Sequence, residues 1–218
     1  MRALRRGLAV VAAAGAVLAA VVLTVLARSV PPRSGREPVA GLRDTVTVVF
    51  DELAIPFISA GDDLDAFAAL GYLHARERLW QMELVRRMAE GRLSEVLGPA
   101  ALSSDRFLRS LDVPLAAERS LALMPAGTRA VLDAYVRGVN AWIAGRPRPL
   151  PPEFQVLRLE PEPWTARQSI EVARMMAWDL TNAAFELDLA RMAARVGAER
   201  VLELFFYLYV DLLQLHAV

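Results

Sequence analysis

The chain has 218 residues, of which 55% are hydrophobic and 23% are charged. This composition predicts a folded domain with a buried core and excludes a wholly disordered chain. The 25 basic residues balance the 25 acidic residues, so the charge favours neither a nucleic acid nor an anionic surface as partner. The sequence has no cysteine and only two histidines, His74 and His216. Disulfides, thiol nucleophiles and zinc sites built from several histidines are therefore excluded.

Residues 1–28 have the pattern of a targeting segment. Arginines within the first six residues precede an uncharged, mostly apolar run from Gly7 to Ala27. A cleaved signal peptide and an uncleaved transmembrane anchor both fit this pattern. The length of the run favours the anchor, whereas the small residues around Ala27 allow cleavage. Both alternatives predict an extracytoplasmic chain that is either membrane-anchored or secreted into the periplasm or medium. Residues 29–44, with several prolines and glycines, predict a linker.

Residues 45–200 predict a mainly helical domain with a short early β-element. Residues 45–50 are all β-branched or aromatic and predict a strand. A second short strand is expected over residues 57–60. Apolar residues at helical spacing predict helices over residues 62–90, 129–144, 166–180 and 185–196. Asp62 or Asp63, Thr128 and Thr165 are the expected N-caps. The first helix is apolar on two sides and is expected to be buried between layers, and residues 154–159 are expected to be extended.

Several motifs follow one another in an order that is more informative than their periodicity. The longest is GYLHARERLWQMELVRRMAEGRLSEVLG, over residues 71–98, and VTVVFDELAIPFISA precedes it. AYVRGVNAWI, LPPEF, EPWT and ARMMAWDL follow it, ending at residue 180. This series resembles the penicillin acylase family of N-terminal nucleophile hydrolases over roughly residues 46–197. Residues 201–218 depart from the resemblance and are interpreted as a divergent or truncated tail.

The resemblance implies a four-layer αββα core, assembled from an α chain and a β chain that are cut from one precursor. This sequence would supply the α-chain portion, and the fold would be incomplete without the β chain. The nucleophile in the family is the first residue of the β chain, usually a serine in a Gly-Ser-Asn motif. Its own α-amino group, with a pKa of about 8, can accept the hydroxyl proton near neutral pH. An amide or a lactone would be hydrolysed through an acyl-enzyme.

The sequence holds no such nucleophile. No glycine precedes a serine, and the only dipeptide that fits is Gly127-Thr128, where Thr128 is the expected helix N-cap. We therefore assign no catalytic residue to this chain and expect a β chain as its partner. A truncation, a frameshift and a split gene all account for a chain that ends before the family's β chain would begin.

The resemblance also implies roles for four residues of the C-terminal part. Met176, Asp179 and Leu180 occupy positions that line the acyl side of the substrate pocket, and Glu186 occupies that of a Ca²⁺ ligand. Simpler interpretations remain for Met176, as a core methionine, and for Glu186, as a carboxylate that stabilises a helix start. Ca²⁺ takes about 6–8 oxygen ligands, so most would come from the β chain. His74 and Arg78 share a helix face and are expected to join a buried polar network rather than to act in catalysis.

Two functions are compatible with these observations. The first is a penicillin acylase-like amide hydrolase that acts on small acyl amides or acyl-homoserine lactones, of which this chain is the α portion, inactive alone. The second is a non-catalytic fragment tethered to the membrane, or an interaction protein of the cell envelope. Neither involves nucleic acid.

Overall fold

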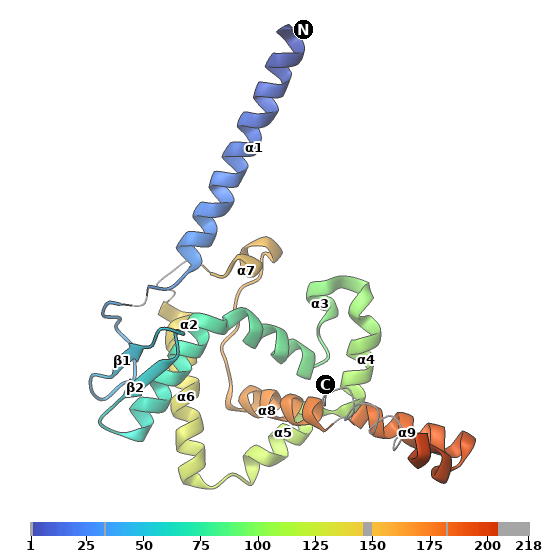
Figure 1. Ribbon diagram of the computed structural model, residues 1–218. Coiled ribbons are helices and arrows are strands. Elements are labelled where there is room, and N and C mark those ends of the chain that lie inside the picture. The colour runs from blue at the N-terminus through green and yellow to red at the C-terminus, as the bar shows by residue number, and fades with distance from the viewer. Residues whose placement is uncertain (1, 33, 146–149, 182, 205–218) are drawn as a thin grey trace, which may run out of the picture. The chain divides into compact units, whose positions relative to one another are not determined.

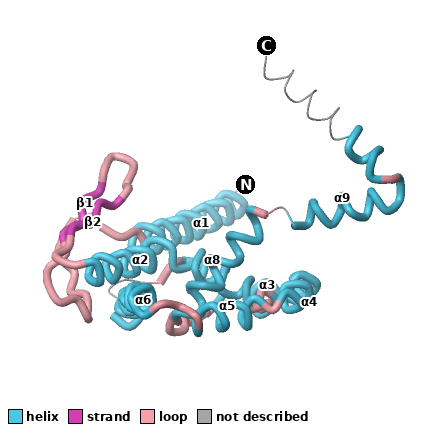
Figure 2. The backbone as a smooth tube through the Cα atoms, turned by 90° about the horizontal axis from the view of Figure 1, so that it is seen from below, coloured by secondary structure: helices cyan, strands magenta, loops and turns pink. Residues whose placement is uncertain are grey.

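The computed structural model describes residues 2–32, 34–145, 150–181 and 183–204, with side chains from residue 13 onward except at 183–185. The chain forms two compact units, residues 1–172 and residues 173–218. The mainly helical class with one early β-element, expected from the sequence, is confirmed (Figures 1 and 2).

The elements of the first unit follow the predicted order, with additional helices. In sequence they are α1 (Arg2–Ser29), β1 (Thr47–Phe50), β2 (Pro56–Ser59), α2 (Asp63–Ala89), α3 (Ser94–Leu97), the 3₁₀ turn η1 (Gly98–Ala101), α4 (Leu102–Leu111), α5 (Val113–Ala122), α6 (Ala126–Gly145) and α7 (Pro152–Leu157). Helix α8 (Ala166–Leu180) begins in the first unit and ends in the second, which also contains α9 (Ala183–Val196).

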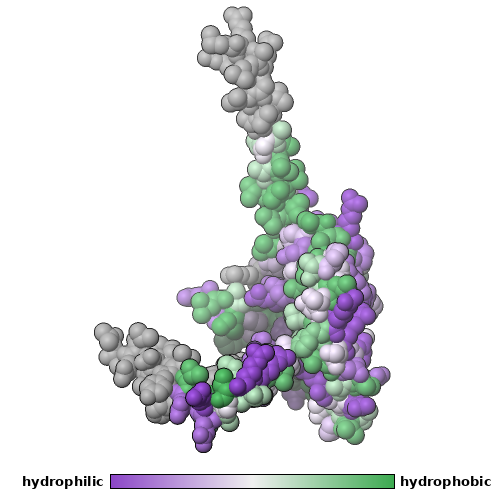
Figure 3. Space-filling view, turned by 90° about the vertical axis from the view of Figure 1, so that its right-hand side faces the viewer, coloured by the Kyte–Doolittle hydropathy of each residue, from purple (hydrophilic) through white to green (hydrophobic). Residues whose placement is uncertain are grey.

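Helix α1 covers the segment in which the sequence predicted a signal peptide or an anchor. Its described side chains are mostly apolar and exposed, with Leu18 and Leu23 each 65% exposed (Figure 3). Within the described residues, no helix combines the length and the apolarity that a bilayer crossing requires.

The two strands form an antiparallel hairpin, in which Thr47 pairs with Ser59 and Phe50 pairs with Pro56. Asp51 builds the turn between them, because its Oδ1 accepts hydrogen bonds from the backbone N–H groups of Leu53 (2.9 Å) and Ile55 (2.7 Å). An Asp at this point of a turn commonly satisfies backbone donors in this way. The hairpin therefore confirms the predicted β-element, with strand limits shifted by one or two residues.

Helix α2 begins as predicted. The carboxylate of Asp62 accepts a hydrogen bond from the N–H of Asp65 at 2.9 Å, which satisfies one of the free donors of the first turn. The helix bends at Arg78, whose φ of −135° is not helical. It ends at Ala89, and Gly91 follows with a positive φ of 61°.

The core of the first unit lies where α2 packs against α6 (Figure 2). Gly71 and Gly138 allow the two backbones to touch: a Cβ on Gly71 would lie 2.0 Å from the carbonyl oxygen of Tyr135. Trp142 is 2% exposed and lies in the core, whereas Trp80 is half-buried with its ring edge-on to Phe154. The buried cluster comprises Tyr72, Ala75, Leu79, Val139, Trp142, Ile143, Phe154 and Trp164.

Three expectations about local structure were wrong. Helix α6 begins at Ala126, because the carbonyl of Pro125 already accepts a helical bond from the N–H of Arg129, so Thr128 lies in the first turn and is not the N-cap. Residues 152–157 are helical rather than extended, since Pro152 at the first helical position pre-organises the backbone for a helix. Helices α4 and α5 lie where no helix was predicted.

A fourth expectation concerned His74 and Arg78, which do not form a buried polar network. Both residues are exposed. The buried charges of α2 are Asp65 in its first turn and, one to three turns beyond Arg78, Glu83, Arg86 and Arg87.

Candidate functional site

The predicted acyl-contacting residues lie on the C-terminal half of α8, within the second unit. Asp179 and Leu180 follow Met176 by three and four residues, so both lie on the side of the helix that bears Met176. This face is exposed: Met176 is 63% exposed and Leu180 is 75% exposed. The core methionine of α8 is Met175, which is 5% exposed. The structure thus brings the three residues together on an open surface that has apolar atoms and one carboxylate.

Glu186 lies in the first turn of α9 and is exposed. A carboxylate there is favoured by the helix dipole, whether or not it binds a metal. In the described part of the chain, no three acidic or histidine side chains gather into a group that could hold a metal ion. Because Ca²⁺ takes about 6–8 oxygen ligands, Glu186 alone does not make a calcium site. Calcium binding stays a prediction that depends on ligands from another polypeptide.

A capping box holds the start of α8. The N–H of Gln168 donates to Thr165 Oγ1 at 3.3 Å, and the N–H of Thr165 donates to Gln168 Oε1 at 2.9 Å. These reciprocal bonds satisfy donors that the first turn of a helix leaves free. Asn140 of α6 fixes the preceding residue, since its amide both donates to the carbonyl of Trp164 (2.8 Å) and accepts from its N–H (2.7 Å). The N-cap role that the sequence predicted for Thr165 is confirmed.

Charged side chains fill the space between the last turns of α2 and the first turns of α8. We call them the buried charge cluster, although four of its members, Arg92, Glu95, Glu162 and Arg167, are partly exposed. The cluster consists of the arginines Arg86, Arg87, Arg92 and Arg167 and of the glutamates Glu83, Glu90, Glu95, Glu162 and Glu171. Arg86 and Glu171 are 0% exposed. Burial of charges is costly unless each is paired, so this cluster is the most demanding part of the first unit.

The cluster is anchored on α2 by Glu83. Its Oε1 accepts a hydrogen bond from Arg87 Nε at 2.6 Å, and its Oε2 accepts a short bond from Arg86. Opposite charges three and four residues apart face each other on a helix, and this spacing is the one signal in the sequence that could have revealed the cluster. It went unrecognised because arginine and glutamate at such spacing are far more common on solvated helix faces.

Glu90 extends the cluster from α2 to α8. Its Oε2 accepts from Arg92 Nη1 at 2.8 Å, and its Oε1 accepts from Arg167 Nη2 at 3.2 Å and from Gln168 Nε2 at 3.3 Å. Arg92, which pairs with Glu90, also forms ion pairs with Glu95 at 2.8 Å and with Glu162 at 3.6 Å. The cluster therefore connects α2 with both the start of α8 and the loop that precedes it.

Glu171 is the least satisfied member of the cluster. Its Oε1 accepts a short hydrogen bond from Arg167, but its Oε2 is buried and has no hydrogen-bond partner. Burial raises the pKa of Glu171 to about 7; Arg167 and Arg86 lower it, and the negative charge of Glu90 raises it further. Arg86 is also under-satisfied, because its Nε and Nη1 make no hydrogen bond, although Nη1 lies 3.3 Å from a carboxylate oxygen of Glu162.

His74 makes one polar contact between α2 and α6. Its Nδ1 lies 3.0 Å from the hydroxyl oxygen of Tyr135, and the two rings meet edge to face at 5.7 Å. Desolvation lowers the pKa of His74 and raises the pKa of Tyr135 to about 12. Both groups are thus neutral at neutral pH, and their hydrogen bond joins α2 to α6.

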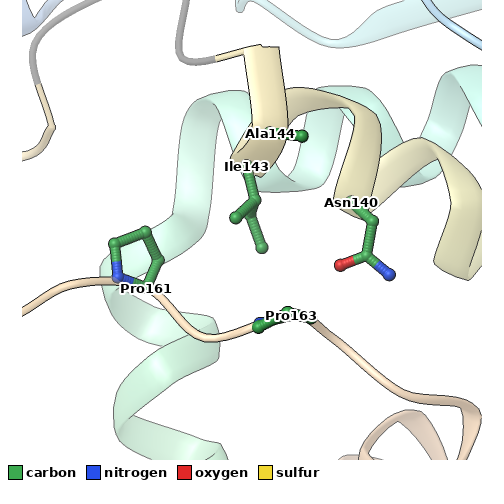
Figure 4. Close-up of a pocket in the computed structure, with 5 residues that line it drawn as sticks. All are labelled: Asn140, Ile143, Ala144, Pro161 and Pro163. Atoms are coloured by element: carbon green, nitrogen blue, oxygen red, sulfur yellow. The ribbon is translucent and has the colours of Figure 1, made fainter.

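A surface recess of about 460 Å³ lies between α6 and the loop before α8 (Figure 4). Its lining consists of Asn140, Ile143, Ala144, Pro161 and Pro163. The amide of Asn140 is already bonded to the backbone of Trp164, as described above. Because the lining is mostly apolar, the recess could receive an apolar group.

The chain belongs to the penicillin amidase family. The family model described as Penicillin amidase matches residues 45–208, which include the hairpin, the buried charge cluster and α8. The penicillin acylase 2 proenzyme of Pseudomonas sp. (strain SE83) is 40% identical over 179 residues, which are 82% of this chain and 23% of that protein. The acyl-homoserine lactone acylase QuiP of Pseudomonas aeruginosa is 35% identical over 80% of this chain and 21% of its own length.

A solved structure is also similar. The thermostable penicillin G acylase from Alcaligenes faecalis superposes with a TM-score of 0.60 at 28% identity, over 75% of this chain and 90% of the matched chain. The fold is thus that of a chain of a penicillin G acylase. The present chain spans less than a quarter of the length of the two curated relatives named above.

Proposed function

We propose that this chain is the α-chain-like part of an acylase that hydrolyses small acyl amides, and that a second polypeptide segment supplies the nucleophile. The observation that carries the proposal is the 40% identity to a penicillin acylase 2 proenzyme over 82% of this chain, which corresponds to 23% of that protein. The segment that carries the nucleophile would lie in the remainder. In keeping with this division, the sequence has no cysteine and no glycine followed by serine.

The proposed contribution of this chain to the reaction is to position the acyl group. Met176 and Leu180 would contact an apolar acyl chain, since a thioether adapts to acyl groups of different shape. Asp179 on the same face would disfavour a substrate that carries a negative charge nearby. The relatives named above are a penicillin acylase and an acyl-homoserine lactone acylase, and both substrate types contain an acyl amide. The proposed reaction is hydrolysis of that amide bond through an acyl-enzyme on the second segment.

The proposal extends to calcium and to location. Glu186 would contribute one oxygen ligand to a Ca²⁺ ion whose remaining ligands come from the second segment. The chain would act outside the cytoplasm, with residues 1–28 as a signal peptide or an anchor. The arginines near the N-terminus and the apolar residues that follow them support this location.

A reconstitution experiment tests the proposed function. The chain, without residues 1–28, is co-expressed with the part of the SE83 penicillin acylase 2 proenzyme that this chain does not match, and the purified material is assayed with chromogenic acyl anilides. If the proposal is right, the two polypeptides co-purify, and the chromogenic aniline is released only when both are present. Turnover by this chain alone would overturn the proposed division of labour.

A non-catalytic protein of the cell envelope is the second candidate. It is favoured by the same absence of a Gly-Ser dipeptide and of cysteine from the sequence. If this candidate is right, the chain and the second segment co-purify stably but do not hydrolyse the anilide, even though the second segment is active with its own natural α portion. That natural pair is therefore included as the positive control.

A further inference from the structure

We propose that Glu171 is a buried proton-binding site that makes the attachment of the first turns of α8 to α2 depend on pH. The proposal rests on the position of Glu171 in the buried charge cluster and goes beyond the proposed acylase function. It concerns only residues of the first unit, and it needs neither a second polypeptide nor a substrate.

The first argument is the geometry of the carboxyl group. Glu171 is 0% exposed, and of its two oxygens only Oε1 has a hydrogen-bond partner, which is Arg167 on the preceding turn of α8. An ionised carboxylate would leave a buried oxygen with negative charge and no donor, which is unfavourable in a medium of low dielectric constant. A protonated carboxyl keeps the bond from Arg167 and places a neutral O–H at the other oxygen. The geometry therefore favours the protonated form.

The second argument is the charge balance of the cluster. It contains five carboxylates and four guanidiniums, so one negative charge is in excess when every member is ionised. A proton on Glu171 brings the cluster to neutrality. Glu171 is the natural site for this proton, because each of the other four glutamates is ion-paired with two arginines, whereas Glu171 is ion-paired with Arg167 alone.

The charged groups that face Glu171 come from α8, from α2 and from the residue that directly follows α2. On α8 Arg167 favours the ionised form, on α2 Arg86 does the same, and Glu90, directly after α2, opposes it. Burial outweighs the two arginines, and the pKa of Glu171 rises to about 7. In the unfolded chain the carboxyl returns to its ordinary pKa near 4.5. The folded state thus holds a proton that the unfolded state has released at every pH between these two values.

The sign of the pH dependence follows from this difference. Because the folded state binds more protons than the unfolded state between about pH 4.5 and pH 7, its stability decreases as the pH rises through that interval. Above pH 7 Glu171 ionises in the folded protein, and the excess negative charge lies between α2 and α8. His74 works in the opposite direction, since its lowered pKa makes stability increase as the pH rises through its titration. The Glu171 contribution must therefore be isolated by substitution.

The experiment compares urea denaturation of the full chain with that of Glu171→Gln at pH 5, 6, 7 and 8. Glutamine keeps the size of the side chain and cannot ionise, so it mimics the protonated form. We expect the unfolding equilibrium constant of the wild-type chain to rise by about tenfold or more relative to the variant between pH 5 and pH 8. Glu118→Gln is the matched control, because Glu118 is an exposed residue of α5. The ratio of its unfolding equilibrium constant to that of the wild-type chain should not change with pH.

A second measurement does not depend on the variant. The side-chain carboxyl carbon of Glu171, assigned by ¹³C NMR in the wild-type chain, should titrate with a midpoint near pH 7. A midpoint near 4.5 would overturn the proposal, and so would an equal pH dependence of stability in the wild-type chain and in Glu171→Gln. Neither result would affect the proposed acylase function, which is tested by reconstitution.

Discussion

Gly138 of α6 lies against the backbone of Ala68 in α2, so closely that a Cβ on Gly138 would come within 1.8 Å of the Ala68 carbonyl oxygen. Real side chains do not tolerate such a distance, so any larger residue must push the two helices apart. The same holds for Gly71 against Tyr135, which makes the α2–α6 contact a two-point backbone contact. The packing of the core cluster that includes Tyr72 and Trp142 depends on this close approach of α2 and α6.

The first prediction follows from this contact. Gly138→Ala should destabilise the chain by about 2–4 kcal/mol, because the helices must separate and core packing is lost. Gly127→Ala in the same helix is the control, since nothing lies within 4 Å of a Cβ there, and it should stabilise the chain by about 0.5–1 kcal/mol through its higher helix propensity. Urea denaturation measures both changes. Equal effects of the two substitutions would show that the contact does not govern stability.

A second prediction separates two adjacent methionines of α8. Met175→Ala should destabilise the protein by about 2–4 kcal/mol, because Met175 is 5% exposed and its removal leaves a cavity. Met176→Ala should change stability by less than about 0.5 kcal/mol, because Met176 is 63% exposed. In the reconstituted acylase, however, Met176→Ala should alter the relative kcat/KM for short and long acyl anilides. Unchanged acyl selectivity would contradict the proposed role of Met176.

A third prediction concerns acid unfolding. Asp65 accepts hydrogen bonds from the backbone N–H groups of Arg43 (3.0 and 3.1 Å) and of Asp44 (2.9 Å). The bond from the Arg43 backbone is the main cause that lowers the pKa of Asp65. The stabilisation from Asp65 is thus present above its ordinary pKa of 3.8 and is lost as the pH falls through the lower value of the folded state.

The substitution that tests this point is Asp65→Asn. The variant should be less stable than the wild-type chain at pH 7, and the difference should shrink as the pH falls below about 4. Circular dichroism during acid titration follows both proteins. Asp63→Asn is a suitable control, because Asp63 lies in the same first turn of α2 and makes no comparable bonds to residues 43 and 44 in the described part of the chain. A constant difference at all pH values would argue against a role for ionisation of Asp65.

The fourth prediction concerns calcium. The chain alone should show no saturable Ca²⁺ binding by calorimetry at micromolar to low millimolar concentrations, because Glu186 is a single carboxylate and Ca²⁺ takes about 6–8 oxygens. The reconstituted complex should bind Ca²⁺, and Glu186→Gln in the complex should weaken that binding at least about tenfold. Glu199→Gln, an exposed glutamate beyond α9, should leave the affinity unchanged. Tight binding by the isolated chain would refute the proposed shared site.

Local rules in the sequence were sufficient for much of the helical framework. Helix α8 begins and ends where periodicity and the Thr165 cap predicted, and α9 stops before Gly197, whose φ is 92°. The motifs around residues 71–98 and 173–180 are specific enough to indicate the family, which the family model over residues 45–208 confirms. Caps, turns and hydrophobic spacing act within a few residues, so they can be predicted from the sequence itself.

The family, the mainly helical class and the identity of the residues available for chemistry thus follow from the order of amino acids. Which charges are buried depends on how the helices pack together in the folded chain. Glu83, Arg86 and Glu171 have ordinary helical spacing, and their burial depends on residues far away, as the bond between Glu90 and Gln168, 78 positions apart, illustrates. Desolvation depends on everything packed around a group, and neighbours brought together by folding cannot be read from one helix face.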